Sequence, residues 1–232
     1  RQMCIRDRPC GLLDQMTSSV GSFVEIDFAD PAKPVIEKLD FDFASCGYAL
    51  CIVDTGGSHS DLTDEYAAVR KEMESVAEYL GKSVLREVDE DEFMKNIADI
   101  RSSCGDRAVL RAMHFYGDNA RVEKQAAALK AGDFETFKKY IIESGRSSYM
   151  YNQNVYSCKK ASEQPVSLAL SLSEKLLDGC GAWRVHGGGF AGTIQAFVPL
   201  NKLDEYKDLM EKVFGSGSCY ILSVRPVGGV EL

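Results

Sequence analysis

The amino-acid sequence predicts an α+β fold in which helices cover layers of antiparallel sheet. Polar and apolar residues alternate over residues 22–28, which is the pattern of a half-buried strand. Residues 106–130 predict a long helix that ends before Gly132. From residue 164 onward the patterns predict helix, strand, loop, strand, helix and strand. That order is typical of an antiparallel sheet with helices on one face.

Local patterns define the elements of the first hundred residues. Residues 9–21 predict a short helix, because Pro9 suits a first turn and Gly21 suits a helix end. The uninterrupted apolar run at 48–53 predicts a strand that is buried on both faces. The other elements expected here are a hairpin of strands 22–28 and 35–41, a loop at 54–60, a helix starting near residue 61 and a helix over 89–100.

The second half predicts helices followed by a glycine-rich connection between two strands. We expect a helix over 134–144 to close at Gly145, and the aromatic and polar stretch 147–158 to be a loop. The remaining expected elements are a helix over 164–177, antiparallel strands over 180–185 and 193–198, a helix over 203–214 and a closing strand over 219–224.

Composition excludes several classes of function. The chain has 232 residues, of which 45% are apolar and 27% charged, as in globular proteins with a core. Its net charge of −8 argues against nucleic acid as the main partner, because binding phosphates needs clustered Lys and Arg. No apolar run reaches the roughly 20 residues that span a bilayer, and no signal peptide is visible. We therefore expect a cytoplasmic protein without a membrane partner, and a monomer.

The eight cysteines predict free thiols. None forms a Cys-x-x-Cys pair, and no histidine lies at zinc-ligand spacing from one. Scattered thiols suit a reducing cytosol better than a disulfide framework. The sequence therefore predicts no metal site built from the residues of this chain.

The glycine-rich stretch 184–192 is the first candidate site. Its consecutive Gly187, Gly188 and Gly189 can take positive φ, and they let backbone N–H groups converge on an anion. Such a loop between two strands is either a tight turn or one wall of a ligand site.

Four other polar or aromatic side chains have both a structural and a functional interpretation. Asp14 lies in the first turns of its helix, where an acid is favourable by itself. Tyr66 is at a position that is more often core than ligand. His59 fits a hydrogen-bonded loop residue, and His114 fits a core histidine with a satisfied ring.

Three segments, taken together in chain order, favour the functional interpretation over the structural one. They are Pro9-Cys10-Gly11-Leu12-Leu13-Asp14-Gln15, His59-Ser60-Asp61-Leu62-Thr63-Asp64-Glu65-Tyr66 and Arg184-Val185-His186-Gly187-Gly188-Gly189-Phe190-Ala191-Gly192. They resemble the segments of galactokinases, in the GHMP family of small-molecule kinases, that carry the active-site Asp, a sugar-site Tyr and the third family motif. Weaker similarities lie at 111–114, 119–122 and 155–158.

The resemblance implies a GHMP-kinase-like fold and a reaction. The γ-phosphoryl group of ATP, bound with Mg²⁺, would be transferred to the anomeric hydroxyl of galactose, giving galactose 1-phosphate. Asp14 would accept a hydrogen bond from that hydroxyl, as general base or as an orienting anion. Gly11 would let the backbone approach the sugar, and Tyr66 would pack on it or bond to it. The three consecutive glycines would line the cleft, and the Mg²⁺ ligands would lie outside this chain.

The resemblance also implies a division of the chain. Residues 1–8 resemble translated sequencing adapter, residues 9–55 a remnant of the GHMP N-terminal domain and residues 56–232 the C-terminal domain. The family's opening sugar motif and its phosphate loop are not found in the sequence. We therefore expect a fragment that is inactive alone and leaves apolar sheet surface uncovered.

Two alternatives to a galactose kinase stay open. His186 and Ala191 stand where the family usually has Thr and often has Gly, and residues 54–57 also differ. These departures allow a kinase for N-acetylgalactosamine, arabinose or a uronic acid. The second alternative is a non-catalytic regulator that binds galactose and ATP.

Overall fold

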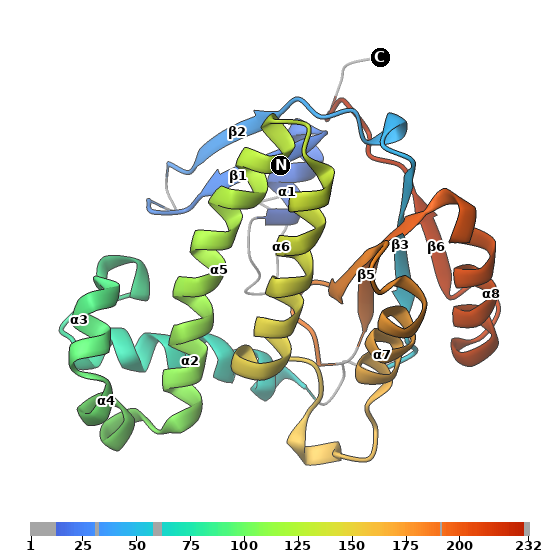
Figure 1. Cartoon of the computed structure of the whole chain (residues 1–232). Helices are drawn as coiled ribbons and strands as arrows, with labels where there is room; N and C mark the ends of the chain where they lie inside the picture. The colour runs from blue at the N-terminus through green and yellow to red at the C-terminus, as the bar shows by residue number, and fades with distance from the viewer. Residues whose placement is uncertain (1–12, 31–32, 58–61, 191, 230–232) are drawn as a thin grey trace.

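The computed structural model of the chain describes residues 13–30, 33–57, 62–190 and 192–229 (Figure 1). Near its amino end, β1 (Phe23–Asp27) and β2 (Val35–Leu39) form an antiparallel hairpin. This confirms the hairpin expected from the alternating patterns. The described part of the first helix, α1 (Leu13–Val20), ends at Gly21, whose φ of 75° is the left-handed conformation that stops a helix.

The larger of the two described sheets is four-stranded and antiparallel. It consists of β3 (Tyr48–Asp54), β4 (Ala182–Val185), β5 (Thr193–Pro199) and β6 (Cys219–Leu222), in the order β4-β5-β3-β6. Strands β4 and β5 pair around the glycine loop, as the sequence predicted. The domain division at residue 55 stays a prediction, although β3 pairs with two strands from the segment assigned to the second domain.

Strand β3 is only half-buried on one face. Ala49, Cys51 and Val53 are buried, whereas Tyr48 and Ile52 on the other face are partly exposed. The prediction of a strand buried on both faces is therefore wrong. An apolar run alone does not show this, because helices cover the second face of the sheet only in part.

The helices form three groups (Figure 1). Helices α7 and α8 lie against one face of the sheet, α5 and α6 lie side by side, and α2, α3 and α4 gather at the end of α5 far from the hairpin. Their bounds are α2 (Thr63–Tyr79), α3 (Glu90–Lys95), α4 (Ile97–Cys104), α5 (Asp106–Lys130), α6 (Phe134–Ser147), α7 (Pro165–Leu177) and α8 (Leu203–Phe214).

Two expected helix boundaries are wrong. The helix expected over 89–100 is broken at Asn96 into α3 and α4, because the Asn96 backbone leaves the helical conformation, with φ of −101° and ψ of 8°. Helix α6 runs past Gly145 and continues as a π-helix (Ser148–Asn152) into the expected loop. Gly145 serves packing instead, since a Cβ there would lie 2.9 Å from Arg184 Cβ on β4.

Three apolar clusters hold these groups together. The first lies between the sheet and helices α7 and α8, and includes Cys51, Ile194 and Met210. The second is aromatic, and Phe134 and Phe197 in it join the hairpin side of the molecule to the sheet. The third lies between α2, α3, α4 and α5.

A polar cluster is buried between α5, α6 and β4. His114 is 8% exposed, and its Nδ1 lies 2.9 Å from Ser147 Oγ, which confirms a satisfied core histidine. Asp118 lies 3.7 Å from the His114 ring and 3.0 Å from Arg121. Arg184 reaches Asp118 through the Ser144 hydroxyl. Burial lowers the pKa of His114. The negative charge of Asp118 acts to raise this pKa, and the positive charges of Arg184 and Arg121 lower it further.

We expect His114 to make the protein less stable in weak acid. Because its pKa is lowered in the folded state, the unfolded chain takes up the proton first as pH falls through 6.5. His114→Gln removes this contribution. The difference in free energy of unfolding between the unchanged protein and His114→Gln should therefore become smaller from pH 7.5 to pH 5.5. Urea unfolding at both pH values measures this difference, and a constant difference would contradict the assignment.

Candidate functional site

The glycine loop between β4 and β5 is a tight, strained backbone turn. The N–H of His186 donates to Thr193 O at 2.9 Å and closes its base. Gly187, Gly189 and Phe190 have φ values of 65°, 81° and 59°. Phenylalanine rarely takes positive φ, so neighbouring contacts must stabilise this conformation.

Tyr66 of α2 packs on one side of the loop. Its hydroxyl donates to Gly189 O at 2.8 Å, and its ring meets the Phe190 ring edge-on at 5.3 Å. A Cβ on Gly188 would lie 2.6 Å from Tyr66 Cε1, so only glycine allows this approach. Burial raises the pKa of Tyr66, which keeps the hydroxyl protonated as a donor. Two predicted site segments therefore meet in space.

Asn154 packs on the other side of the loop. Its carbonyl accepts a hydrogen bond from the Phe190 N–H at 2.5 Å, and its side-chain amide donates to Gly188 O at 3.2 Å. A Cβ on Gly189 would lie 1.9 Å from Asn154 O. The sequence gives no indication of this role for Asn154, because an asparagine in a stretch expected to be loop carries no signal of a long-range contact.

Asp14 forms no contact with this assembly among the described residues. It is exposed in the first turn of α1, and its side chain forms no hydrogen bond or ion pair with the described residues. No contact joins it to Tyr66 or the glycine loop within the described ranges. The site role of Asp14 thus stays a prediction, and Gly11, also expected at the sugar, lies outside the described residues.

A cavity of about 730 Å³ adjoins the glycine loop at Phe190. Thr55, Gly56 and Gly57, which follow β3, line it. The Thr55 hydroxyl donates to Gly192 O at 2.6 Å, so this segment is tied to the end of the glycine loop. The loop after β3, expected from its position at the end of a buried strand, therefore lies beside the candidate site.

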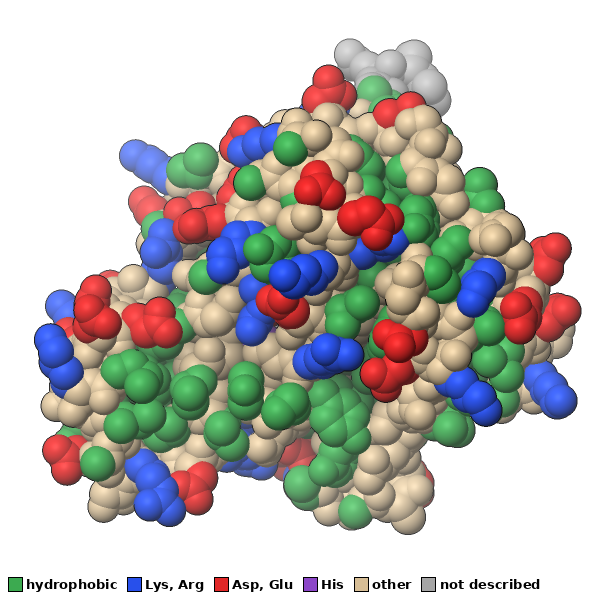
Figure 2. Space-filling model, viewed as in Figure 1, with side chains coloured by type: hydrophobic (Ala, Val, Ile, Leu, Met, Phe, Trp, Pro, Cys, Tyr) green, Lys and Arg blue, Asp and Glu red, His purple; other side chains and the backbone are tan. Residues whose placement is uncertain are grey.

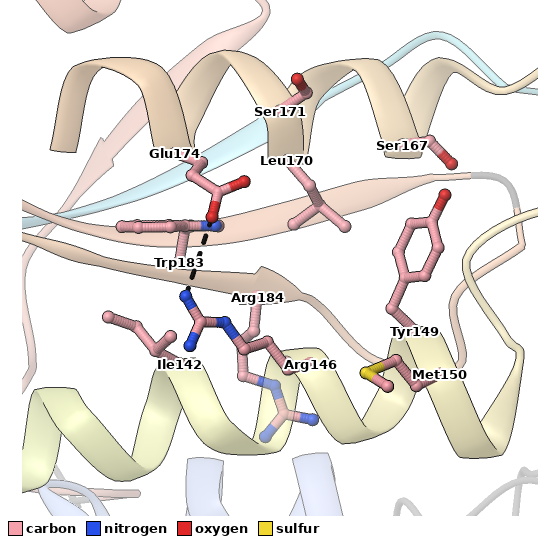
Figure 3. A pocket seen from close by; sticks show the side chains of 11 residues that line it. Ile142, Arg146, Tyr149, Met150, Ser167, Leu170, Ser171, Glu174, Trp183 and Arg184 are labelled. Atoms are coloured by element: carbon pink, nitrogen blue, oxygen red, sulfur yellow. Dashed lines mark ion pairs between the residues drawn. The ribbon is translucent and has the colours of Figure 1, made fainter. Parts of the chain in front are cut away.

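A second hollow of about 420 Å³ lies between α6 and α7 over β4 (Figure 3). Arg146 and Glu174 face each other across it at 3.8 Å, and Trp183, the only tryptophan of the sequence, also lines it. Arg184 is the only residue of the glycine-rich stretch that lines this hollow among those described. We assign it no role.

No three His, Cys, Asp or Glu side chains gather as metal ligands within the described ranges. The described cysteines are free thiols; Cys51 and Cys219 are buried and Cys158 is exposed.

On the face of the molecule that Figure 2 shows, basic and acidic side chains are interspersed, and no large patch carries a single sign of charge. No helix among the described residues is long and apolar enough to cross a membrane.

Known proteins resemble this chain in sequence and in fold. No family model matches the chain. It is 29% identical to human galactokinase over 224 residues, which cover 97% of this chain and 54% of that protein. It is 30% identical to the galactokinase of Thermotoga neapolitana over 204 residues, which cover 88% and 52% respectively. The chain is homologous to the galactokinases, which are GHMP kinases.

Solved GHMP kinases share its fold. Lactococcus lactis galactokinase, solved with galactose, has a TM-score of 0.70 and 21% identity, covering 97% of this chain and 57% of its own. L. major mevalonate kinase, solved with R-mevalonate, has a TM-score of 0.58 and 12% identity. These likenesses confirm the GHMP-kinase-like α+β class. The chain spans about half the length of the curated relatives that it matches.

We expect Gly189→Ala to destabilise the loop more than Gly187→Ala. Both glycines have positive φ, which costs about 1 kcal/mol for alanine. Only at Gly189 does the added methyl overlap another atom, Asn154 O; nothing lies within 4 Å at Gly187. The melting temperature of Gly189→Ala should be lower than that of Gly187→Ala by roughly 4 °C or more. Equal melting temperatures would show that the loop does not depend on this close contact.

Proposed function

We propose that this chain serves a sugar-kinase reaction in which ATP phosphorylates galactose at its anomeric hydroxyl. The observation that carries the proposal is the hydrogen bond from Tyr66 to Gly189, across 123 residues of sequence. It joins the segment resembling the sugar-site motif to the segment resembling the third GHMP motif. Homology to galactokinases over about half of their length supports the same reaction.

In the proposed reaction Asp14 acts on the acceptor hydroxyl. An exposed carboxylate without a partner among the described residues is free to accept a hydrogen bond from a sugar. Phosphoryl transfer depends mostly on positioning and on charge stabilisation. Asp14 would therefore orient the anomeric oxygen and take its proton late in the transfer.

Tyr66 and the glycine loop would form a wall of the sugar site. The Tyr66 hydroxyl is already engaged with Gly189 O, so its ring rather than its hydroxyl is the surface for packing on a sugar. Of the three glycines, only Gly187 has open space where a side chain would stand, so the transferred phosphoryl group would approach the backbone there. ATP would bring Mg²⁺ with it, and no ligand for that ion is assigned to this chain.

A kinase for a different sugar is the second candidate. Residues 55–57 line the cavity beside Phe190, and the sequence around them departs from the galactokinase pattern. A change of lining residues can change which sugar is accepted, because a buried polar group left unpaired costs binding energy. N-acetylgalactosamine, arabinose and a uronic acid are the sugars to compare with galactose.

We expect Asp14→Asn to lower the turnover of the accepted sugar by about 10²–10⁴-fold, the usual size of general acid–base effects. The measurement is ADP release with ATP, Mg²⁺ and each sugar in turn, made in a longer protein that contains this chain, because the chain alone is expected to be inactive. Asp99→Asn is the matched control, because Asp99 is also an exposed first-turn acid of an eight-residue helix. Equal turnover in Asp14→Asn and the unchanged protein would remove Asp14 from the reaction. Sugar binding without turnover would favour a regulator.

A further inference from the structure

We propose that Arg111 is a positioning residue that sets the spacing of the two walls holding the glycine loop. One wall is Tyr66 on α2, and the other is Asn154 after the π-helix. The importance of this spacing for catalysis rests on the proposed function, whereas the spacing itself does not.

Arg111 is a buried cation that joins two elements. Its side chain is 0% exposed on α5. Nη1 donates to Glu72 Oε2 of α2 at 2.8 Å, and Nε donates to Asn152 O of the π-helix at 3.0 Å. Burial lowers the pKa of Arg111 and Glu72 opposes this. Because an arginine stays charged in proteins, burying it is unfavourable without such partners.

The segment that Arg111 holds is itself unusual. The π-helix (Ser148–Asn152) is a rare conformation, and Gln153 after it has a φ of 54°. The Gln153 N–H bonds to Ser148 O at 2.8 Å, which closes the turn. Arg111 binds the last carbonyl of the π-helix, so it stabilises the backbone only two residues before Asn154.

Both walls of the glycine loop are therefore connected through hydrogen bonds to one guanidinium, that of Arg111. Glu72 and Tyr66 share helix α2, while Asn152 and Asn154 share the segment after α6. The contacts at Gly188 and Gly189 allow little change in separation, because a Cβ on either would overlap Tyr66 or Asn154. A guanidinium suits this task, since its planar fork donates in two fixed directions.

The buried groups around Arg111 are incompletely paired. Nη2 of Arg111, Oδ1 of Asn152 and Oδ1 of Asn154 are buried without a hydrogen-bond partner among the described residues. Unpaired buried polar atoms are unfavourable for stability and are commonest where function constrains a structure. A cluster selected for stability alone would replace them with apolar groups.

Arg107 provides a matched control on the same helix. Its Nε lies 3.0 Å and 3.1 Å from the two oxygens of Glu72, so it also joins α5 to α2. Its side chain is 43% exposed, and no bond to Asn152 is found for it. Losing Arg107 weakens the α2–α5 contact and leaves the second wall in place.

Hydrogen exchange of the whole chain, followed by mass spectrometry, tests the proposal. In Arg111→Met, amides of residues 152–154 and 186–190 should exchange at least about tenfold faster than in Arg107→Met, with α8 unchanged. Arg111→Lys keeps the charge beside Glu72 but offers one nitrogen. Arg111→Lys should have the melting temperature of the unchanged protein and still show fast amide exchange in the glycine loop. It replaces Arg111→Met in the test if Arg111→Met does not fold.

Equal loop exchange in the Arg111 and Arg107 variants, or a uniform rise over the whole chain, would overturn the positioning role. Activity separates this inference from the proposed function. If sugar turnover is found, Arg111→Lys should lower kcat more than it changes KM for the sugar, and unchanged kcat would also overturn it. Absence of sugar turnover in a longer protein that contains this chain, with the expected exchange pattern, would remove the proposed function and leave the positioning role supported.

Discussion

The candidate site depends on one steric constraint, the absence of side chains at Gly188 and Gly189. Tyr66 approaches one glycine and the Asn154 carbonyl approaches the other, at distances that exclude any Cβ. The hydrogen bonds from Tyr66 and Asn154 then hold the loop carbonyls, and Phe190 keeps its positive φ because Asn154 holds its N–H. Glycine is therefore required here for close approach as well as for conformational freedom.

The rest of the fold brings these contacts together. Helix α2 carries Tyr66 to the loop, and the π-helix after α6 carries Asn154 there. Helix α6 can lie against β4 only because Gly145 has no side chain, and the aromatic cluster around Phe134 ties the same helix to the sheet. Gly145, Gly188 and Gly189 thus fix how closely the helices, the loop and the sheet pack, while apolar burial supplies most of the stability.

Much of this fold could be predicted from local patterns. Strands such as β5 and helices such as α5 follow from hydrophobic period, and their bounds agree closely with the expected ranges. The errors have physical causes that lie outside the local sequence. Gly145 looks like a helix end, but a contact with β4 determines its role. The one-sided burial of β3 depends on which faces the helices cover.

The site could be predicted only where a motif carried it. Tyr66 and the glycines were found through family resemblance, and the structure brings them into contact. Asn154 and Arg111 were not assigned, because their partners are 34 or more residues away and no local pattern encodes a long-range bond. A signal for Arg111 did exist: a charged residue on the apolar side of α5, beside His114. A buried charge needs partners from other elements, so a charge on an apolar helix face indicates where a distant segment must pack.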